Sequence, residues 1–289
     1  YVAIEGYPGK PTLDSIVGLR LNSDVSSAGS FESGNELFNR IQGITQWTML
    51  SNVFSVESDC PHRERLGYGA DIITASEVAM LNFDMSRFYA KAARDFQDGQ
   101  FANGAMPETA PYVGIGGDGS KGVPPIGWGS AHPVVVWNLY QYYGDKVLLQ
   151  EQYGAAKRWV DFIKTVADKN DGIIDGDISD HESLSQKPRK YTGTAFYYWS
   201  TKLLARMAGV LGKSGDQSKY SALAESVKKT LQAKFVDKET GLPGNADQSS
   251  LTFALYLDLV PAKKRQEVFD ALVNDVVAQR NGHISTGIF

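Results

Sequence analysis

Apolar side chains recur at three- and four-residue intervals from residue 33 onward, the spacing that places them on one face of an α-helix. Residues 33–36, Ser-Gly-Asn-Glu, have the form of a capping box, and Leu37, Ile41 and Ile44 continue along one face. Further helices are predicted near 71–96, 131–143, 145–168, 194–211, 217–234, 248–259 and 262–280. Residues suited to caps or first turns stand at three of their starts: Asp145, Asp216 and Pro261. About eight helices without alternating strands favour an all-α domain over a doubly wound α/β fold.

The first 32 residues follow a different pattern. Residues 1–4 and 16–21 are short apolar or alternating runs, separated by prolines and a glycine. Such runs predict strands, so residues 1–32 are expected to end a β module and link it to the helical domain. The loops at 97–130 and 170–192 are long and rich in Gly, Asp and Pro, and long loops between helices usually carry function. A toroid of helical hairpins with an active cleft at one end is the expected arrangement.

The composition narrows the possible functions. A net charge of −4 and a pI near 5.6 provide no basic surface for nucleic acid or for an anionic membrane. No apolar run approaches the roughly 18 residues that a transmembrane helix needs. Cys60 is the only cysteine, which excludes a disulfide framework and is compatible with either cytoplasm or periplasm. A cytoplasmic, periplasmic or secreted location all remain open.

The densest chemistry lies at residues 59–71, Asp-Cys-Pro-His-Arg-Glu-Arg-Leu-Gly-Tyr-Gly-Ala-Asp. This segment holds five carboxylate or guanidinium side chains and a tyrosine in thirteen positions. A packed core does not favour that density, because an unpaired buried charge is costly. In a carbohydrate site, carboxylates act as acid, base or hydroxyl acceptor, and an aromatic ring stacks on the sugar. The local pattern therefore predicts a polar binding or catalytic loop.

The order of residues in this segment resembles the signature of the bacterial α-L-rhamnosidases of glycoside hydrolase family 78. Residues 59–67 resemble the signature itself, and Asp71 matches its closing aspartate. Residues 143–145, Tyr-Gly-Asp, and 281–289, Asn-Gly-His-Ile-Ser-Thr-Gly-Ile-Phe, resemble further landmarks of that family. The resemblance implies an (α/α)6 barrel that is incomplete in this chain. Residues 33–289 would form its N-terminal two-thirds, and residues 1–32 the end of a preceding β-sandwich with its linker.

The resemblance also implies roles for single residues. Glu64 matches the general acid of the family, and Asp59, Arg63 and Asp71 match residues that hold the rhamnose hydroxyls and orient the acid. Tyr68 stands where the family usually has tryptophan. An aromatic residue of the sugar site is matched by Trp128. The substrate would be a rhamnose-containing oligosaccharide or glycoside, with no cofactor and no metal.

A further departure from the family, beside Tyr68, bears on the substrate. The family commonly reads Trp-x-Asp-Ala where this chain has Trp-Gly-Ser-Ala at 128–131, so Ser130 stands in place of a carboxylate. Family members invert the anomeric centre, and inversion needs a second carboxylate roughly 6.5–9.5 Å from the acid. The matching base would lie downstream of Phe289, in later barrel and C-terminal β domains of the same polypeptide.

Several alternatives stay open at this stage. The site suits a hydrolase for another deoxy or uronic sugar on the same barrel, or a carbohydrate-binding relative without activity. Glu64 beside two arginines also fits a surface ion pair, and Trp128 also fits an ordinary core. Four acidic residues at 175–182 include candidates for a further subsite: Asp175, Asp177, Asp180 and Glu182. Residues 168–172 resemble a calcium loop, although glycine falls one position early and no Glu closes it.

Overall fold

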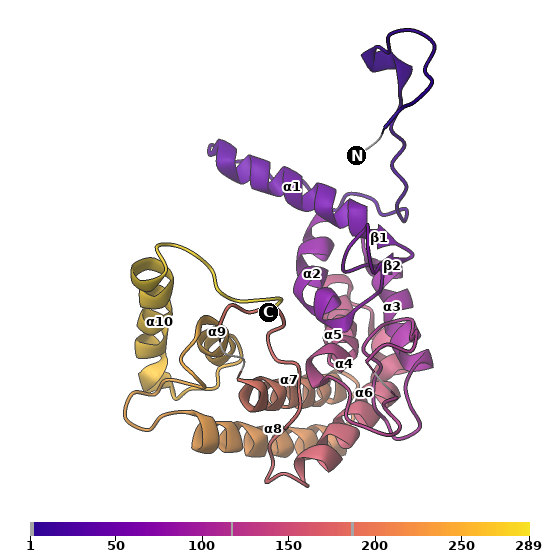
Figure 1. Cartoon of the computed structure of the whole chain (residues 1–289). Helices are drawn as coiled ribbons and strands as arrows, with labels where there is room; N and C mark the ends of the chain where they lie inside the picture. Colours follow the sequence, from indigo (N-terminus) through magenta and orange to yellow (C-terminus); the bar gives the residue numbers. More distant parts are fainter. Residues whose placement is uncertain (1–2, 117, 186–187) are drawn as a thin grey trace.

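The computed structural model describes residues 3–116, 118–185 and 188–289, and helices dominate this part of the chain (Figure 1). The α-helices are α1 (Glu36–Asn52), α2 (Gly69–Asn82), α3 (Ser86–Asp98), α4 (Ile126–Gly129), α5 (Ala131–Tyr143), α6 (Lys146–Ala167), α7 (Arg189–Val210), α8 (Ser214–Phe235), α9 (Gln248–Tyr256) and α10 (Arg265–Asn274). Short 3-10 turns form η1 (Leu13–Ser15) and η2 (Ala262–Lys264), and a π turn forms η3 (Asp275–Gln279). One hairpin, β1 (Val53–Phe54) and β2 (Val56–Glu57), is the only named sheet among the described residues. The predicted all-α class is confirmed.

The helices pack as neighbouring pairs around one core. Helix α7 lies along α8 and also contacts α6, while α2 and α3 both pack on α5 (Figure 1). Their buried faces share one hydrophobic cluster that runs from α2 to α9, with Trp159, Tyr89 and Phe196 among its largest members. A smaller cluster joins α9 to α10. No helix in the described ranges is both long and apolar enough to span a bilayer.

Side chains cap the starts of α1, α6 and α9. Asp145 caps α6, because its Oδ1 accepts a hydrogen bond from the backbone N–H of Leu148 at 2.9 Å, and that prediction is confirmed. The capping box predicted at 33–36 is wrong. Asn35 is the cap of α1, and the N–H of Ser33 is already bound by the side chain of Asn39 at 2.9 Å.

Other predicted bounds shift. Helix α7 begins at Arg189, directly after Pro188, rather than at 194, because proline suits the start of a helix. Asp216 lies in the first turn of α8, as predicted. The segment predicted as one helix over 262–280 is divided among η2, α10 and η3, and Pro261 precedes the short 3-10 turn.

The single helix predicted over 71–96 is also wrong, because the chain breaks between α2 and α3. Phe83 is extended, with φ −137° and ψ 154°, and pairs with Ser27 in an isolated antiparallel bridge. The N–H of Asp84 donates to the carbonyl of Ser26 at 2.8 Å, and the Asp84 carboxylate accepts from the N–H of Ser86. These long-range contacts replace the helical hydrogen bonds, and their partners are not visible in local periodicity.

The predicted strands at the N-terminus are not formed in the described residues. Residues 1 and 2 of the first lie outside them, and 16–21 have extended backbone with no partner strand. The side chains of Val17, Leu19 and Leu21 are at least 76% exposed, and this segment extends away from the helices (Figure 1). A strand needs a neighbour to satisfy its backbone N–H and C=O groups. That the segment belongs to an upstream β-sandwich stays a prediction.

Candidate active site

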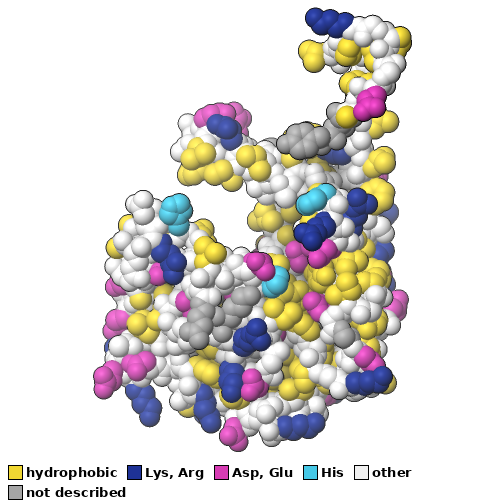
Figure 2. Space-filling model, viewed as in Figure 1, with side chains coloured by type: hydrophobic (Ala, Val, Ile, Leu, Met, Phe, Trp, Pro, Cys, Tyr) yellow, Lys and Arg dark blue, Asp and Glu magenta, His cyan; other side chains and the backbone are white. Residues whose placement is uncertain are grey.

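A cavity of about 350 Å³ lies where the signature loop, the start of α2, α4 and the two long loops converge. Its walls are mostly polar or aromatic side chains: Asp59, Glu64, Tyr68, Asp71, Glu108, Trp128, Ile178, His181 and Ile288. Five of the six residues predicted for the site therefore lie together, although they come from two separate stretches of the chain. The space-filling view shows acidic and histidine side chains next to one another in the middle of this face (Figure 2).

The signature loop is closed by its own first residue. The Oδ1 of Asp59 accepts a hydrogen bond from the N–H of Leu66 at 3.0 Å, and the N–H of Asp59 donates to the carbonyl of Leu66 at 3.1 Å. Within the loop, the N–H of Glu64 donates to the Sγ of Cys60 at 3.2 Å, so this thiol has a structural contact. The loop carries Glu64 to the rim of the cavity as an exposed side chain. Arg63 is also exposed and is not among the lining residues.

The two glycines after the loop allow the 97–130 loop to dock on it. A Cβ on Gly67 would lie 2.3 Å from the carbonyl oxygen of Ala110, and one on Gly69 would lie 2.0 Å from that of Trp128. The close approach allows two backbone hydrogen bonds. The N–H of Gly69 donates to the carbonyl of Glu108, and the N–H of Ala110 donates to the carbonyl of Gly67. These contacts join the signature loop to the opposite wall of the cavity.

The carboxylates of the cavity are crowded and partly desolvated. Burial raises the pKa of Asp71 to about 6, and the charges of Asp59 and Glu64 act in the same direction, against a backbone hydrogen bond that lowers it. The pKa of Tyr68 rises to about 12, first because of burial and then because of the neighbouring carboxylates, Glu64 foremost. Burial alone raises the pKa of Glu108. Among the described residues, no lysine or arginine lines this acidic cavity.

Glu57, at the end of β2, is a buried carboxyl whose charge interacts with that of Asp71. Its side chain is only 4% exposed, and neither of its oxygens has a hydrogen bond of normal geometry. Burial raises the pKa of Glu57 to about 8, the nearby phenol of Tyr89 lowers it, and the charge of Asp71 raises it further. A carboxyl in this position is protonated near neutral pH, which avoids the cost of a buried unpaired charge.

Trp128 forms one wall from the short helix α4. The side chain is 4% exposed, lines the cavity, and makes edge-to-face contacts with His181 and Phe289 at centroid distances of 6.1 and 5.6 Å. Ser130 faces away from the cavity instead. It is fully buried, its hydroxyl donates to the carbonyl of Ile126 and it accepts from the hydroxyl of Ser200. The serine that departs from the family pattern therefore has a packing role in this structure.

Of the acidic residues predicted in the 170–192 loop, two are buried and two are exposed. Asp177 and Asp180 are buried, but backbone N–H groups occupy their carboxylates: those of Gly127 and Ser179 for Asp177, and those of Gly287 and Phe289 for Asp180. Asp175 pairs with Lys190, and Glu182 lies beside His181. None of the four lines this cavity, and Asp177 and Asp180 bind the backbone of its walls. That one of them belongs to a further subsite stays a prediction.

Four lining residues were not predicted: Glu108, Ile178, His181 and Ile288. The only sequence signal for three of them was the expectation that the two long loops carry function. His283, in the last landmark, is exposed, whereas Ile288 five residues later reaches the cavity. Among the described residues, no group of three or more His, Cys, Asp or Glu side chains is arranged to hold a metal ion.

An all-helical domain that brings carboxylates and aromatic rings into one cavity is compatible with a glycoside hydrolase domain. The chain belongs to the family of the bacterial α-L-rhamnosidase six-hairpin glycosidase domain, whose model matches residues 26–289. This family, glycoside hydrolase family 78, is the one that the signature predicted.

Individual relatives agree with this assignment. An α-L-rhamnosidase of Streptomyces avermitilis is 32% identical over 99% of this chain, which covers 27% of that protein. The solved structure of Streptomyces avermitilis α-L-rhamnosidase complexed with L-rhamnose superposes with a TM-score of 0.89 at 31% identity, over 97% of this chain and 26% of that one. The enzyme from Dictyoglumus thermophilum gives a TM-score of 0.88 at 35% identity, over 98% and 32% of the two chains. The chain therefore spans about a third or less of the length of these relatives.

Proposed function

We propose that the protein containing this chain hydrolyses terminal α-L-rhamnosyl bonds of oligosaccharides or glycosides with inversion of the anomeric centre. The observation that carries the proposal is the set of Asp59, Glu64 and Asp71 around one cavity with Trp128 as a wall. The chain also resembles an α-L-rhamnosidase whose structure was solved with L-rhamnose. A complete barrel of the (α/α)6 type, preceded by a β-sandwich, would supply the rest of the site.

Each residue has a role in this reaction. Glu64 is the general acid, because its exposed carboxyl at the rim can reach the oxygen of the departing group. Asp59 and Asp71 accept hydrogen bonds from the sugar hydroxyls, and Arg63 orients the acid. Tyr68 and Trp128 shape the pocket by contact with the sugar ring. The general base, a carboxylate on the opposite face of the ring, is expected downstream of Phe289.

The decisive experiment measures the hydrolysis of an aryl α-L-rhamnoside by the full-length protein and its Glu64→Gln variant. Loss of a general acid is expected to lower kcat by roughly 10²- to 10⁴-fold. Glu239→Gln is the matched control, because Glu239 is exposed on a loop outside the cavity and should leave turnover unchanged. Equal turnover by wild type and Glu64→Gln would contradict the assignment of the acid.

A panel of other aryl glycosides separates the alternatives. Turnover of another deoxy or uronic sugar in preference to rhamnoside would assign a different substrate to the same barrel. Binding of L-rhamnose without turnover of any glycoside would identify a carbohydrate-binding relative.

A further inference from the structure

Glu108 occupies a position in the cavity that the family signature does not contain. It lies in the loop between α3 and α4, and its backbone is fixed to the signature segment. Its carbonyl accepts from the N–H of Gly69 at 3.0 Å, and the next residue, Thr109, forms an antiparallel bridge with Tyr68. Ala110 continues the pairing through Gly67. The signature segment thus sets where the Glu108 side chain enters the cavity.

The carboxyl of Glu108 faces the cavity and has no protein partner in the described part of the chain. The residue is 9% exposed and lines the cavity, yet no hydrogen bond or ion pair is found for its side chain there. Burial is the sole cause that raises its pKa. Gly116 packs directly against it, since a Cβ on that glycine would lie 1.9 Å from Oε2. A carboxylate that lines a cavity without a protein partner keeps its acceptor oxygens available to a ligand.

The neighbours of Glu108 show which part of the cavity it faces. Its charge contributes to the raised pKa of Tyr68, as do the charges of Glu64 and Asp59, so these carboxylates lie around the same phenol. Within residues 3–116, 118–185 and 188–289, no lysine or arginine lines the cavity to neutralise them. A neutral polyhydroxylated ring, which brings several O–H donors and no negative charge, fits this environment.

We infer that Glu108 is a specificity-determining residue whose carboxyl accepts a hydrogen bond from one hydroxyl of the sugar ring held in the cavity. This inference rests on the proposed function and adds a contact that the signature residues do not supply. Glu108 holds its own loop through its backbone carbonyl, which a change of side chain leaves in place. Substitution therefore removes the contact to the sugar without releasing the loop.

The test compares full-length wild type with Glu108→Ala on an aryl α-L-rhamnoside and on its 2-deoxy, 3-deoxy and 4-deoxy analogues. Loss of a hydrogen bond to a carboxylate is expected to lower kcat/KM on the parent by about 10- to 100-fold. On the one analogue that lacks the contacted hydroxyl, the two proteins should differ by less than about threefold, because the contact is already absent. Glu108→Gln, which keeps one acceptor oxygen, should recover part of the loss.

The control variant separates a contact with the sugar from an effect of substitution in general. Glu239→Ala, an exposed change outside the cavity, should match wild type on all four substrates. An equal loss in Glu108→Ala on the parent and on every analogue would show a structural role and overturn the inference, as would no loss at all. Failure of wild type to hydrolyse the rhamnoside, with no change of tryptophan fluorescence on addition of L-rhamnose, would overturn the proposed function and this inference with it.

Discussion

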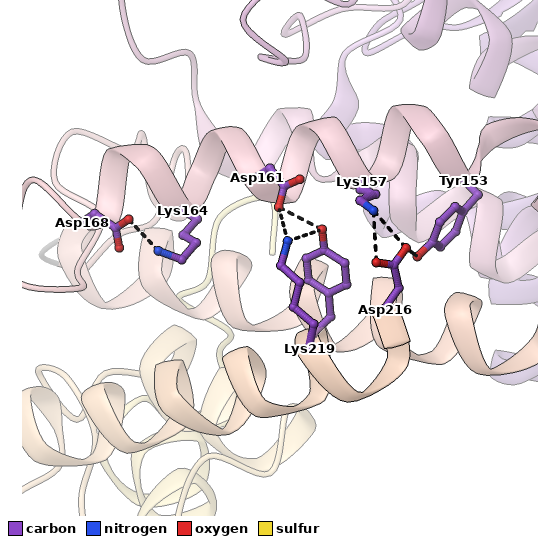
Figure 3. A network of polar contacts seen from close by, with 8 residues as sticks. Tyr153, Lys157, Asp161, Lys164, Asp168, Asp216 and Lys219 are labelled. Carbon is purple, nitrogen blue, oxygen red and sulfur yellow. Dashed lines mark hydrogen bonds and ion pairs between the residues drawn. The ribbon is translucent and has the colours of Figure 1, made fainter. Parts of the chain in front are cut away.

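Acidic side chains occur both in the cavity and along the contact between α6 and α8, which we call the seam. The two regions differ in whether a cation lies beside each carboxylate. At the seam, Asp216 accepts from the hydroxyl of Tyr153 at 2.8 Å and from the Nζ of Lys157 at 3.0 Å (Figure 3). Those hydrogen bonds lower the pKa of Asp216. One turn further along, Asp161 contacts Lys219 and accepts from the hydroxyl of Tyr220. Each carboxylate of the seam has a cation beside it.

The cavity carboxylates lack such cations. Within the described part of the chain, no salt bridge reaches Asp59, Glu64, Asp71 or Glu108, and burial raises the pKa of two of them. Carboxylates that join helices are paired with cations, whereas those of the cavity have at most backbone hydrogen bonds in the described part of the chain. Unpaired carboxylates with raised pKa values are typical of functional sites, so this difference supports the proposed roles of the cavity residues.

The largest effect expected from this difference is a pH dependence of stability due to Glu57. Its pKa is about 8 in the folded protein and 4.5 in an ordinary environment, so the folded state binds more protons between these values. The contribution of Glu57 to the free energy of unfolding is therefore most favourable below about pH 4.5. It falls by about 4 kcal/mol as the pH rises to 8. Urea unfolding of wild type and Glu57→Gln at several pH values measures it. The variant should show a flatter dependence between pH 5 and 8.

A control separates Glu57 from the other titrating groups. Glu36→Gln changes an exposed carboxyl in the first turn of α1 and should leave the pH dependence of unfolding as in wild type. The amide that Glu57→Gln introduces is also buried without a partner, so the slope with pH, rather than the stability at one pH, is the informative quantity. Parallel curves for wild type and Glu57→Gln would mean that Glu57 is ionised in the folded protein.

The next largest effect is expected from Gly69→Ala, which breaks the junction between the two walls of the cavity. The added Cβ would lie 2.0 Å from the carbonyl oxygen of Trp128, a backbone atom that cannot rotate away. We expect a loss of about 3 kcal/mol in the free energy of unfolding and a fall in turnover of at least about tenfold. Thermal unfolding and rhamnoside hydrolysis measure the two effects.

Gly154→Ala is the matched control for this change. Gly154 lies in the interior of α6, and its added Cβ would have only the distant guanidinium of Arg158 within reach, at 3.8 Å. Alanine favours a helix interior over glycine by about 0.5–1 kcal/mol, so this variant should be more stable than wild type with unchanged turnover. If both variants lost stability alike, the close approach at Gly69 would not be the cause.

Features of the fold and site that depend on neighbouring residues could be predicted from the sequence, and those that depend on distant contacts could not. Helical spacing predicted most elements, and the order of residues in 59–71 predicted the site, because both signals are local. The break at Phe83 depends on Ser26 and Ser27, more than 50 residues away, and periodicity carries no trace of that contact. Glu108 was missed for the same reason.

The walls of the cavity contain residues that the sequence predicted and residues that it did not. Trp128 was predicted because it belongs to a recognisable motif. Ile288 and His181 were not, because their positions depend on hydrogen bonds made by Asp180, a residue distant in sequence from Ile288. The carboxylate of Asp180 binds the N–H groups of Gly287 and Phe289, on either side of Ile288. The sequence presented Asp180 as a candidate subsite residue, and only the structure shows that it is buried and binds this segment.

An intermediate effect is expected from Asp180→Ala, which tests this support. Two backbone N–H groups and the hydroxyl of Ser249 would lose their acceptor, and the segment with Ile288 would be released from the wall. We expect a loss of about 2 kcal/mol in the free energy of unfolding and a higher KM for the rhamnoside, with kcat less affected. Steady-state kinetics separates the two parameters. A fall in kcat alone would instead indicate a direct role of Asp180 in the reaction.

The smallest effect is expected at the seam itself, from Asp216→Ala. Although this carboxylate has three hydrogen bonds, its partner Lys157 is partly exposed, and ion pairs of that kind contribute about 0–1 kcal/mol. Tyr153 and Lys157 both regain water as a partner when the carboxylate is removed, so the free energy of unfolding should fall by about 1 kcal/mol or less. Turnover should stay at the wild-type level, because the seam lies outside the cavity. A loss of turnover in Asp216→Ala, measured at a temperature where the variant is fully folded, would show that the two sets of carboxylates are coupled and that their separation into structural and functional groups is wrong.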